Sequence, residues 1–257
     1  MAVGDPKRIL YTGLPGIPPI RNGDELAEII SVAIDEAAID PAFGDVLVIA
    51  QKIVSKAEGR CLHLSAFAPS AEAYRLARIV GKDPRHVEAI LSESTEIIRA
   101  TEGVLIVVHR LGFVMANAGI DQSNVGDSGQ EILLLPRDPD ATCARLKAEL
   151  DARYKADLGI IINDSFGRPW RNGVVGVAIG AAGVPALQSL VGTPDLYGRA
   201  LRITEVALAD ELAAAASLVM GQSAEGLPVV HVRGFAATGQ SSNAAALIRP
   251  KERDLFR

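Results

Sequence analysis

The chain has 257 residues, of which 49% are hydrophobic and 22% charged, and its formal net charge is −5. This is the composition of an ordinary globular protein, and its acidic balance argues against binding nucleic acid or a membrane surface through a basic face. No apolar run reaches the roughly 18 residues of a membrane span, and the polar N-terminus has no signal-peptide core, so we expect a cytoplasmic protein.

Predicted strands and helices follow one another irregularly along the chain. Runs rich in Val and Ile, bounded by Gly, Asp or Pro, predict strands over 8–11, 45–50, 103–109, 112–115, 159–162, 174–179 and 228–233. Helical spacing of apolar residues predicts helices over 26–38, 71–80, 85–91, 140–154 and 203–220. We expect Asp24 to cap the first helix, Asp138 to Asp140 to cap the fourth, and Gly221 to end the last.

This order is not the regular βαβα alternation of a doubly wound fold. It favours an α+β fold with a mixed sheet. We expect one domain over residues 1–257, because no linker divides the chain. The segment over about 62–102 is the candidate for a lobe of its own. A shift toward Gly, Ser, Ala and Thr near residue 234 predicts a loop followed by a polar tail over about 236–257.

Two short, glycine-containing segments each place an acid near a neutral oxygen donor. Asp121 is followed by Asn124, and Asp164 by Ser165. Hard cations such as Mg²⁺ and Mn²⁺ prefer these ligands, and Mg²⁺ usually binds one or two carboxylates together with substrate phosphates. Each acid follows a predicted strand, which would fix it beside an open loop. Helix capping or turn formation is the alternative role for each acid.

The second acidic segment continues into Arg168, Trp170 and Arg171. The planar guanidinium group suits phosphate and carboxylate, so this part of the chain is a candidate for binding an anionic substrate. Trp170 is the only tryptophan, and it would either stack on an aromatic ligand or pack against the protein.

Three further segments allow a binding role and a structural one. The basic segment 51–60 is interpreted as a loop after a buried strand, where Lys56 would neutralise phosphate or belong to a solvated charged face. The opening loop 13–19 would bind a ligand through its backbone or form an irregular turn. The helix end and glycines over 220–226 would wrap a ligand or form a plain C-cap.

Other common sites are not indicated. The four histidines have no metal-ligand spacing, and the two distant cysteines predict neither a disulfide framework nor a thiolate zinc site. The sequence contains no G-x-x-x-x-G-K-[ST], no G-x-G-x-x-G that opens a helix, and no G-x-S-x-G. A nucleotide would therefore have to bind in an unusual cradle.

Taken together and in order, the motifs resemble those of a known family. The segments 13–15, 48–60, 116–124, 164–171, 178–180 and 209–221 closely resemble the coenzyme F420-0:L-glutamate ligases, that is, the CofE family and the ligase half of FbiB. The resemblance extends from about residue 9 to residue 235.

The resemblance implies a reaction and an assembly. GTP would phosphorylate the terminal carboxylate of the deazaflavin precursor F420-0, and the amine of L-glutamate would displace phosphate; further γ-linked glutamates would follow. Mg²⁺ or Mn²⁺ is implied, with K⁺ as an additional cation, as are a fold particular to the family and an intertwined homodimer. Two-domain bacterial relatives carry a flavin-binding, nitroreductase-like C-terminal domain; the chain stops at Arg257, so we expect that activity to be absent.

Roles are carried over by position. The resemblance implies metal ligands at Asp121, Asp164, Ser165 and Gln222, and catalytic roles for Asp121, Asp164, Lys56 and Arg168. It implies nucleotide contacts at Leu14, Pro15, Gly16, Ile17, Gln51, Lys56, Asn124, Met220, Gly221, Gln222, Ser223, Ala224, Glu225, Gly226 and Leu227. Ser165 stands where many relatives have threonine and keeps a hydroxyl, whereas Gln51 replaces a serine.

Two other functions remain open at this point. The same acids and hydroxyl would serve a metal-dependent phosphohydrolase, which would release phosphate from GTP without F420-0 or glutamate. A non-catalytic GTP-binding module would bind GTP without turnover, although intact acids, hydroxyl and Lys56 argue against a degenerate site.

Overall fold

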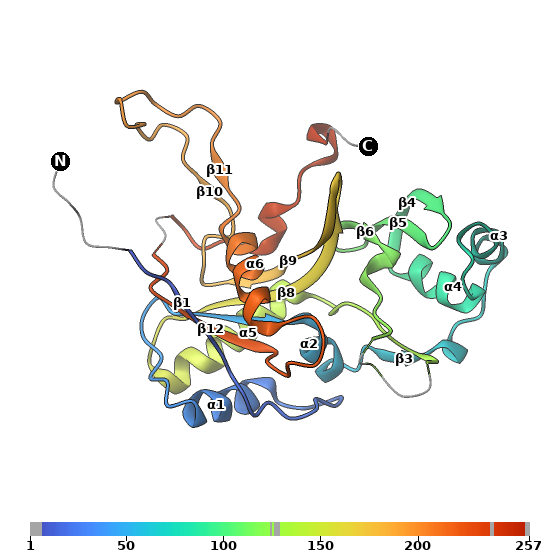
Figure 1. Cartoon of the computed structure of the whole chain (residues 1–257), viewed down its shortest axis with the longest axis horizontal. Coiled ribbons are helices and arrows are strands. Elements are labelled where there is room, and N and C mark those ends of the chain that lie inside the picture. The colour runs from blue at the N-terminus through green and yellow to red at the C-terminus, as the bar shows by residue number, and fades with distance from the viewer. Residues whose placement is uncertain (1–6, 124, 126–128, 237–238, 255–257) are drawn as a thin grey trace.

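A computed structural model describes residues 7–123, 125, 129–236 and 239–254 of the chain. Its centre is a five-stranded sheet in the order β1-β12-β2-β8-β9 (Figure 1). These strands are β1 (Leu10–Gly13), β12 (Val229–Arg233), β2 (Val46–Ala50), β8 (Gly159–Arg168) and β9 (Arg171–Ala182). Only β2 and β8 pair in parallel in this sheet; the other neighbours are antiparallel, so the sheet is mixed. The expectation of a mixed-sheet α+β arrangement is confirmed at this level.

Helices cover both faces of the sheet, because the side chains of its central strands alternate between two apolar clusters. Leu47 and Ile160 point into the cluster with α1 (Leu26–Glu36) and α5 (Pro139–Tyr154). Val48 and Ile161 face the opposite cluster, together with α6 (Leu208–Met220). Because both faces of the sheet are covered, its buried strands are apolar on both sides, and this packing fixes the backbone at their ends.

The helix boundaries test the predicted caps. Asp138 accepts a hydrogen bond from the backbone N–H of Ala141, which confirms a cap at the start of α5. The prediction for Asp24 is wrong: Glu25 occupies the N-cap of α1, and the Asp24 carboxylate accepts from the N–H of Arg21 instead. Gly221 follows α6 with φ of 73°, as predicted.

A smaller lobe packs beside the central sheet (Figure 1). It holds a three-stranded sheet and two helices around a separate apolar cluster that reaches Ala118. Its elements are α3 (Ala71–Val80), α4 (Pro84–Ser92), β4 (Ser94–Thr101), β5 (Val104–His109), β6 (Val114–Ala116) and the 3₁₀ turns Leu64–Ala66 and Asn117–Gly119. The short pair β3 (Cys61–His63) and β7 (Glu131–Leu133) joins it to the sheet. The segment over about 62–102, the candidate for a lobe of its own, lies here, and the lobe continues beyond it to Gly119.

Two hairpins project from the sheet (Figure 1). One is the end of β8 and β9, which extend beyond their predicted bounds so that Arg168 and Arg171 face each other across the turn. The other is an arm with the short strands β10 (Gln188–Ser189) and β11 (Glu205–Val206). The last helix was predicted to begin at residue 203, but α6 begins at Leu208, and the residues before it belong to the arm. The 3₁₀ turns Ala244–Leu247 and Lys251–Arg253 follow near the C-terminus.

The basic segment after β2 differs most from its prediction. Residues predicted as a loop form α2 (Gln51–Ala57), which begins directly where β2 ends. Four residues of this helix, Gln51, Ile53, Val54 and Ser55, are buried, so packing stabilises a helix too short to be stable alone. In the part of the chain that the structure describes, no helix has the length and apolar content needed to cross a membrane.

Candidate active site

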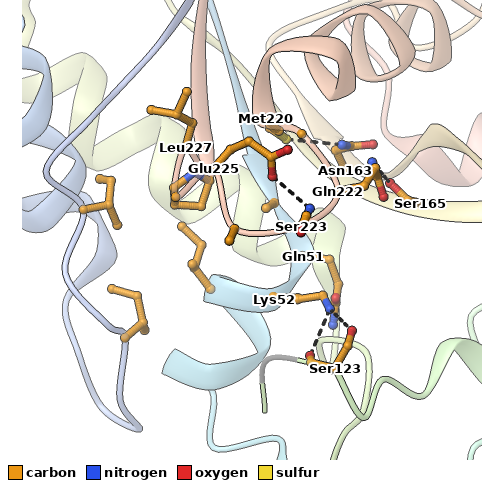
Figure 2. Close-up of a pocket in the computed structure, with 18 of the residues that line it drawn as sticks. Gln51, Lys52, Ser123, Asn163, Ser165, Met220, Gln222, Ser223, Glu225 and Leu227 are labelled. Carbon is orange, nitrogen blue, oxygen red and sulfur yellow. Dashed lines mark hydrogen bonds between the residues drawn. The ribbon is translucent and has the colours of Figure 1, made fainter. Parts of the chain in front are cut away.

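A cavity of about 510 Å³ lies at the carboxyl end of β2 and beside the middle of β8. Five parts of the chain line it: the loop after β1, the start of α2, the Asp121 segment, the middle of β8, and the segment that follows α6. Figure 2 shows side chains from α2, β8 and the α6 end around this space. Two short segments more than forty residues apart in sequence, those of Asp121 and Asp164, therefore meet in one place, as their shared chemistry predicted.

The two acids reach the cavity from different supports. Asp121 lies after the 3₁₀ turn of the smaller lobe and pairs with Leu133 in an isolated β-bridge. Asp164 lies within β8 and not in a loop after it, so that detail of the sequence interpretation is wrong. The β8–β9 register shifts between Ile162 and Asn163, and such irregularities re-aim side chains next to functional sites.

Asp164 is electrostatically strained. Burial, with a further contribution from the charge of Asp121, raises the pKa of Asp164 to about 7, against the opposing effects of the Ser165 N–H and Lys52. The Ser165 N–H donates to Asp164 Oδ1 at 2.8 Å. Two neighbouring carboxylates in a partly buried site are unfavourable without a nearby positive charge, which is the environment that a bound cation relieves.

Lys52 is a site residue that the sequence interpretation did not assign. Its Nζ lies 3.2 Å from Asp121 Oδ2 and donates to the hydroxyl of Ser123 at 3.0 Å and to its carbonyl at 3.2 Å (Figure 2). Because α2 is a helix, Lys52 and Lys56 are four residues apart on one face, and both line the cavity. A prediction of helix for this segment would have placed Lys52 on the same face as Lys56 and so indicated it as a site residue.

Two buried amides frame the floor of the cavity. Gln51 is 2% exposed; its Nε2 donates to Ser55 Oγ at 2.7 Å, while its Oε1 has no partner among the described residues. Asn163, 4% exposed, donates to Ser217 Oγ at 3.0 Å. It also contacts Met220 Sδ at 3.5 Å (Figure 2). Asn163 thus ties the strand that carries Asp164 to the end of α6.

The segment 221–227 forms one wall of the cavity. Gln222 Nε2 donates to Ser165 Oγ at 3.0 Å, and the Ser223 N–H donates to Glu225 Oε2 at 2.8 Å (Figure 2). Gly221 has positive φ, and a Cβ there would lie 2.1 Å from the Glu225 carboxyl carbon. A glycine is therefore required for the chain to fold back over the cavity.

The remaining predicted positions divide into two groups. Ile17, Gln51, Lys56, Asp121, Asp164, Ser165 and all of Met220 to Leu227 line the cavity. Leu14, Pro15, Gly16 and Arg168 do not line it: Leu14 is fully buried, while the other three are exposed. Asn124 lies outside the described residues.

The donor set fits a hard divalent cation. Asp121, Asp164, Ser165 and Gln222 offer only oxygen atoms and an amide, and none of the described residues supplies a group of three or more His, Cys, Asp or Glu for a self-sufficient metal cage. Mg²⁺ and Mn²⁺ are bound in this way, with phosphate and water oxygens completing the coordination.

Comparison with known proteins shows the family of the chain. A family model described as F420-0:gamma-glutamyl ligase matches residues 16–234. The chain belongs to this family. It is 48% identical to the coenzyme F420:L-glutamate ligase of Methanothermobacter thermautotrophicus over 97% of the chain and 99% of that protein. It is 47% identical to the ligase of the same name from Methanopyrus kandleri, over 93% of each chain.

A third relative is similar to the chain along nearly its whole length. The coenzyme F420:L-glutamate ligase of Methanocaldococcus jannaschii is 40% identical over 99% of both chains. The match thus includes the cavity, the projecting arm and the smaller lobe together. The family resemblance inferred from the motifs is confirmed.

Proposed function

We propose that this chain is a GTP-dependent coenzyme F420-0:L-glutamate ligase that acts in the cytoplasm and adds one glutamate, then further γ-linked glutamates. The observation that carries the proposal is the meeting of Asp121, Asp164 and two lysines in one cavity of a chain from this family. Such a cavity suits a triphosphate and a carboxylate, two anions that would otherwise repel each other.

The chemistry requires the acceptor carboxylate to be activated. A carboxylate oxygen attacks the γ-phosphorus of GTP, the bond to the GDP oxygen breaks, and an acyl phosphate forms. The glutamate amine then attacks the acyl carbon, the C–O bond to phosphate breaks, and the nitrogen loses a proton. Phosphoryl transfer is accelerated mainly by positioning and by positive charge around the transferring group.

The residues of the cavity divide this work. Asp121, Asp164, Ser165 and Gln222 would hold Mg²⁺ or Mn²⁺, which supplies charge neutralisation at the phosphates when bound. Lys56 and Lys52 bring further positive charge from α2, and K⁺ is the additional cation that we propose. The wall formed by 221–227 would exclude water from the reactive acyl phosphate.

The test is mass spectrometry of F420-0 incubated with the protein, GTP, Mg²⁺ and L-glutamate. We expect a product heavier by one glutamyl residue, with GDP and phosphate formed in equal amounts, and no product when any component is left out. Phosphate release that needs neither F420-0 nor glutamate would instead identify a phosphohydrolase.

Replacing Lys52 with methionine tests the residue that the structure adds to the site. Lys52→Met should lower kcat/KM for ligation by about 10–100-fold, because the Asp121 carboxylate and the Ser123 segment lose the group that positions them. Steady-state kinetics at saturating Mg²⁺ measures this. Lys251→Met, which removes an exposed ion pair with Glu96, is the control and should behave as wild type; an unchanged Lys52→Met enzyme would remove Lys52 from the site.

We also propose that the chain forms a homodimer. What supports this is the projecting arm, on which Leu196, Tyr197 and Ile203 are 99%, 84% and 88% exposed. Large apolar side chains gathered on one projection mark an association surface. Light scattering should give twice the 27.0 kDa chain mass.

Charging the arm should separate the subunits. We expect Leu196→Glu with Ile203→Glu to weaken association by at least roughly 100-fold, because each buried apolar side chain contributes about 1.5–3 kcal/mol. Val32→Glu, at a half-exposed position on α1, is the control. Dimers that persist unchanged in the double variant would show that the arm is not the contact.

A further inference from the structure

The tip of the β8–β9 hairpin carries chemistry that the cavity does not use. Arg168 and Arg171 are directly opposite each other across the turn, and Trp170 lies between them in sequence. All three are exposed, with Trp170 at 79%. Burial of the Trp170 indole inside its own chain, which would satisfy one of the two roles left open by the sequence, is therefore not what the structure shows.

The backbone at Trp170 is unusual for such a large side chain. Its φ is 58°, in the left-handed region that glycine occupies readily and bulky residues rarely adopt. Residues held in such conformations are concentrated at functional sites. An indole that is 79% exposed at this position costs conformational energy and gains little burial.

The tip carries two positive charges, those of Arg168 and Arg171. Among the residues that the structure describes, no carboxylate forms an ion pair with Arg168 or Arg171. The Arg168 guanidinium donates to the carbonyl of Gly173 at 3.3 Å. Two guanidinium groups beside an indole, in a chain of net charge −5, form a surface suited to a ligand that is both anionic and aromatic.

The tip and the cavity lie on one strand. β8 carries Asp164 and Ser165 at the cavity and continues without interruption to Arg168. At about 3.3 Å per residue, Arg168 lies roughly 10 Å beyond Ser165 along the strand. A ligand with a carboxylate at the cavity and a charged aromatic body would span that distance.

We infer that the hairpin tip, formed by Arg168, Trp170 and Arg171, binds the aromatic, anionic body of the acceptor substrate while its carboxylate enters the cavity. This inference rests on the proposed function, in which the acceptor is the deazaflavin F420-0. The tip then determines which carboxylate is offered to GTP, and the cavity determines the chemistry. Arg168 is a substrate-binding residue in this arrangement and does not line the nucleotide cavity.

The test measures the affinity for F420-0 by titrating its deazaflavin fluorescence, and the affinity for GTP by calorimetry. Trp170→Gly removes the indole and suits the positive φ, so the turn is retained. It should raise the Kd for F420-0 by roughly 5–100-fold, the usual effect of losing one aromatic stacking partner. Trp170→Tyr should restore most of the affinity. The pair Arg168→Gln and Arg171→Gln should also raise this Kd by at least tenfold, with the Kd for GTP within twofold of wild type.

Phe43→Gly is the matched control, because Phe43 is 83% exposed but precedes β2, at the end of the strand away from the cavity. Suppose that the wild type ligates F420-0 and that the tip variants bind F420-0 with a Kd within twofold of wild type. This result would overturn the inference and leave the proposed function standing. Tip variants that change only the oligomeric mass would also overturn it and assign the tip to a subunit contact. A wild type that neither binds nor ligates F420-0 would overturn both.

Discussion

Replacing Asp164 with asparagine should lower kcat for ligation by more than about 100-fold while leaving the protein folded. Asparagine has nearly the same shape but cannot give a divalent cation a charged ligand, and loss even of a group that only supports a metal ligand typically costs about 10–100-fold. The measurement is steady-state turnover at saturating GTP and F420-0, with Mg²⁺ varied over a wide range.

Stability provides an independent readout for the same variant. Asp164 is partly buried beside the like charge of Asp121, and its pKa is raised to about 7, so a neutral side chain relieves an unfavourable interaction. The melting temperature of Asp164→Asn without metal should equal or exceed that of the wild type. Asp157→Asn, at an exposed acid paired with Lys147, is the control and should retain activity. Near-wild-type turnover of Asp164→Asn at limiting Mg²⁺ would contradict the role of Asp164.

Replacing Glu93 with glutamine should lower the free energy of unfolding by about 3 kcal/mol, the cost of breaking a buried ion pair. Glu93 follows α4 and is 7% exposed. Its Oε2 lies 2.7 Å from Arg60 Nη2 and 3.0 Å from Arg110 Nε. Arg60 also donates to the carbonyl of Leu135 at 2.8 Å, so the cluster joins the smaller lobe to the segment that leads into α5.

The dependence of this effect on pH has a definite sign. Although burial opposes it, the close contacts of His109 and Arg60 with the carboxylate and the charges of Arg60 and Arg110 lower the pKa of Glu93 from 4.5 to about 2. The folded protein therefore binds this proton less readily than the unfolded chain, and the stabilisation is complete above pH 4.5. It is lost progressively as the pH falls from 4.5 toward 2.

Denaturant titrations of wild type and Glu93→Gln between pH 7 and pH 3 test this expectation. The difference between the two proteins should be largest at pH 7 and should shrink on acidification. Glu72→Gln, which removes an exposed pair with Arg75, is the control and should change stability by less than about 1 kcal/mol. A Glu93→Gln difference that stays constant with pH would contradict the ionised cluster.

The sequence predicts the buried central strands well, because β2, the first part of β8 and most of β12 are apolar runs bounded by breakers. The shared ligand chemistry of Asp121 and Asp164 also predicts, without any structure, that the two acids belong to one site. β4 was not predicted, because its side chains are mostly exposed and polar and its hydrogen bonds to β5 are non-local.

The errors at the site have a common physical cause. The sequence predicts a loop in place of α2 because the basic residues obscure the helical period, whereas packing of Ile53 and Val54 against the sheet stabilises the helix. Lys52 was missed for that reason. Asp164 was placed in a loop because β8 changes from apolar to polar residues at Asn163, although its pairing with β9 continues to Arg168. Pairing between distant strands is not visible in local composition.

The central claim is that Asp121 and Asp164 bind one divalent cation that also contacts the nucleotide phosphates. The most direct test is a crystal structure with Mn²⁺ and a non-hydrolysable GTP analogue, in which manganese is located by its anomalous scattering. We predict one manganese peak with oxygen atoms of both carboxylates and of the phosphates about 2.1 Å away. A nucleotide bound in the cavity with both carboxylates turned away from the manganese would contradict the account.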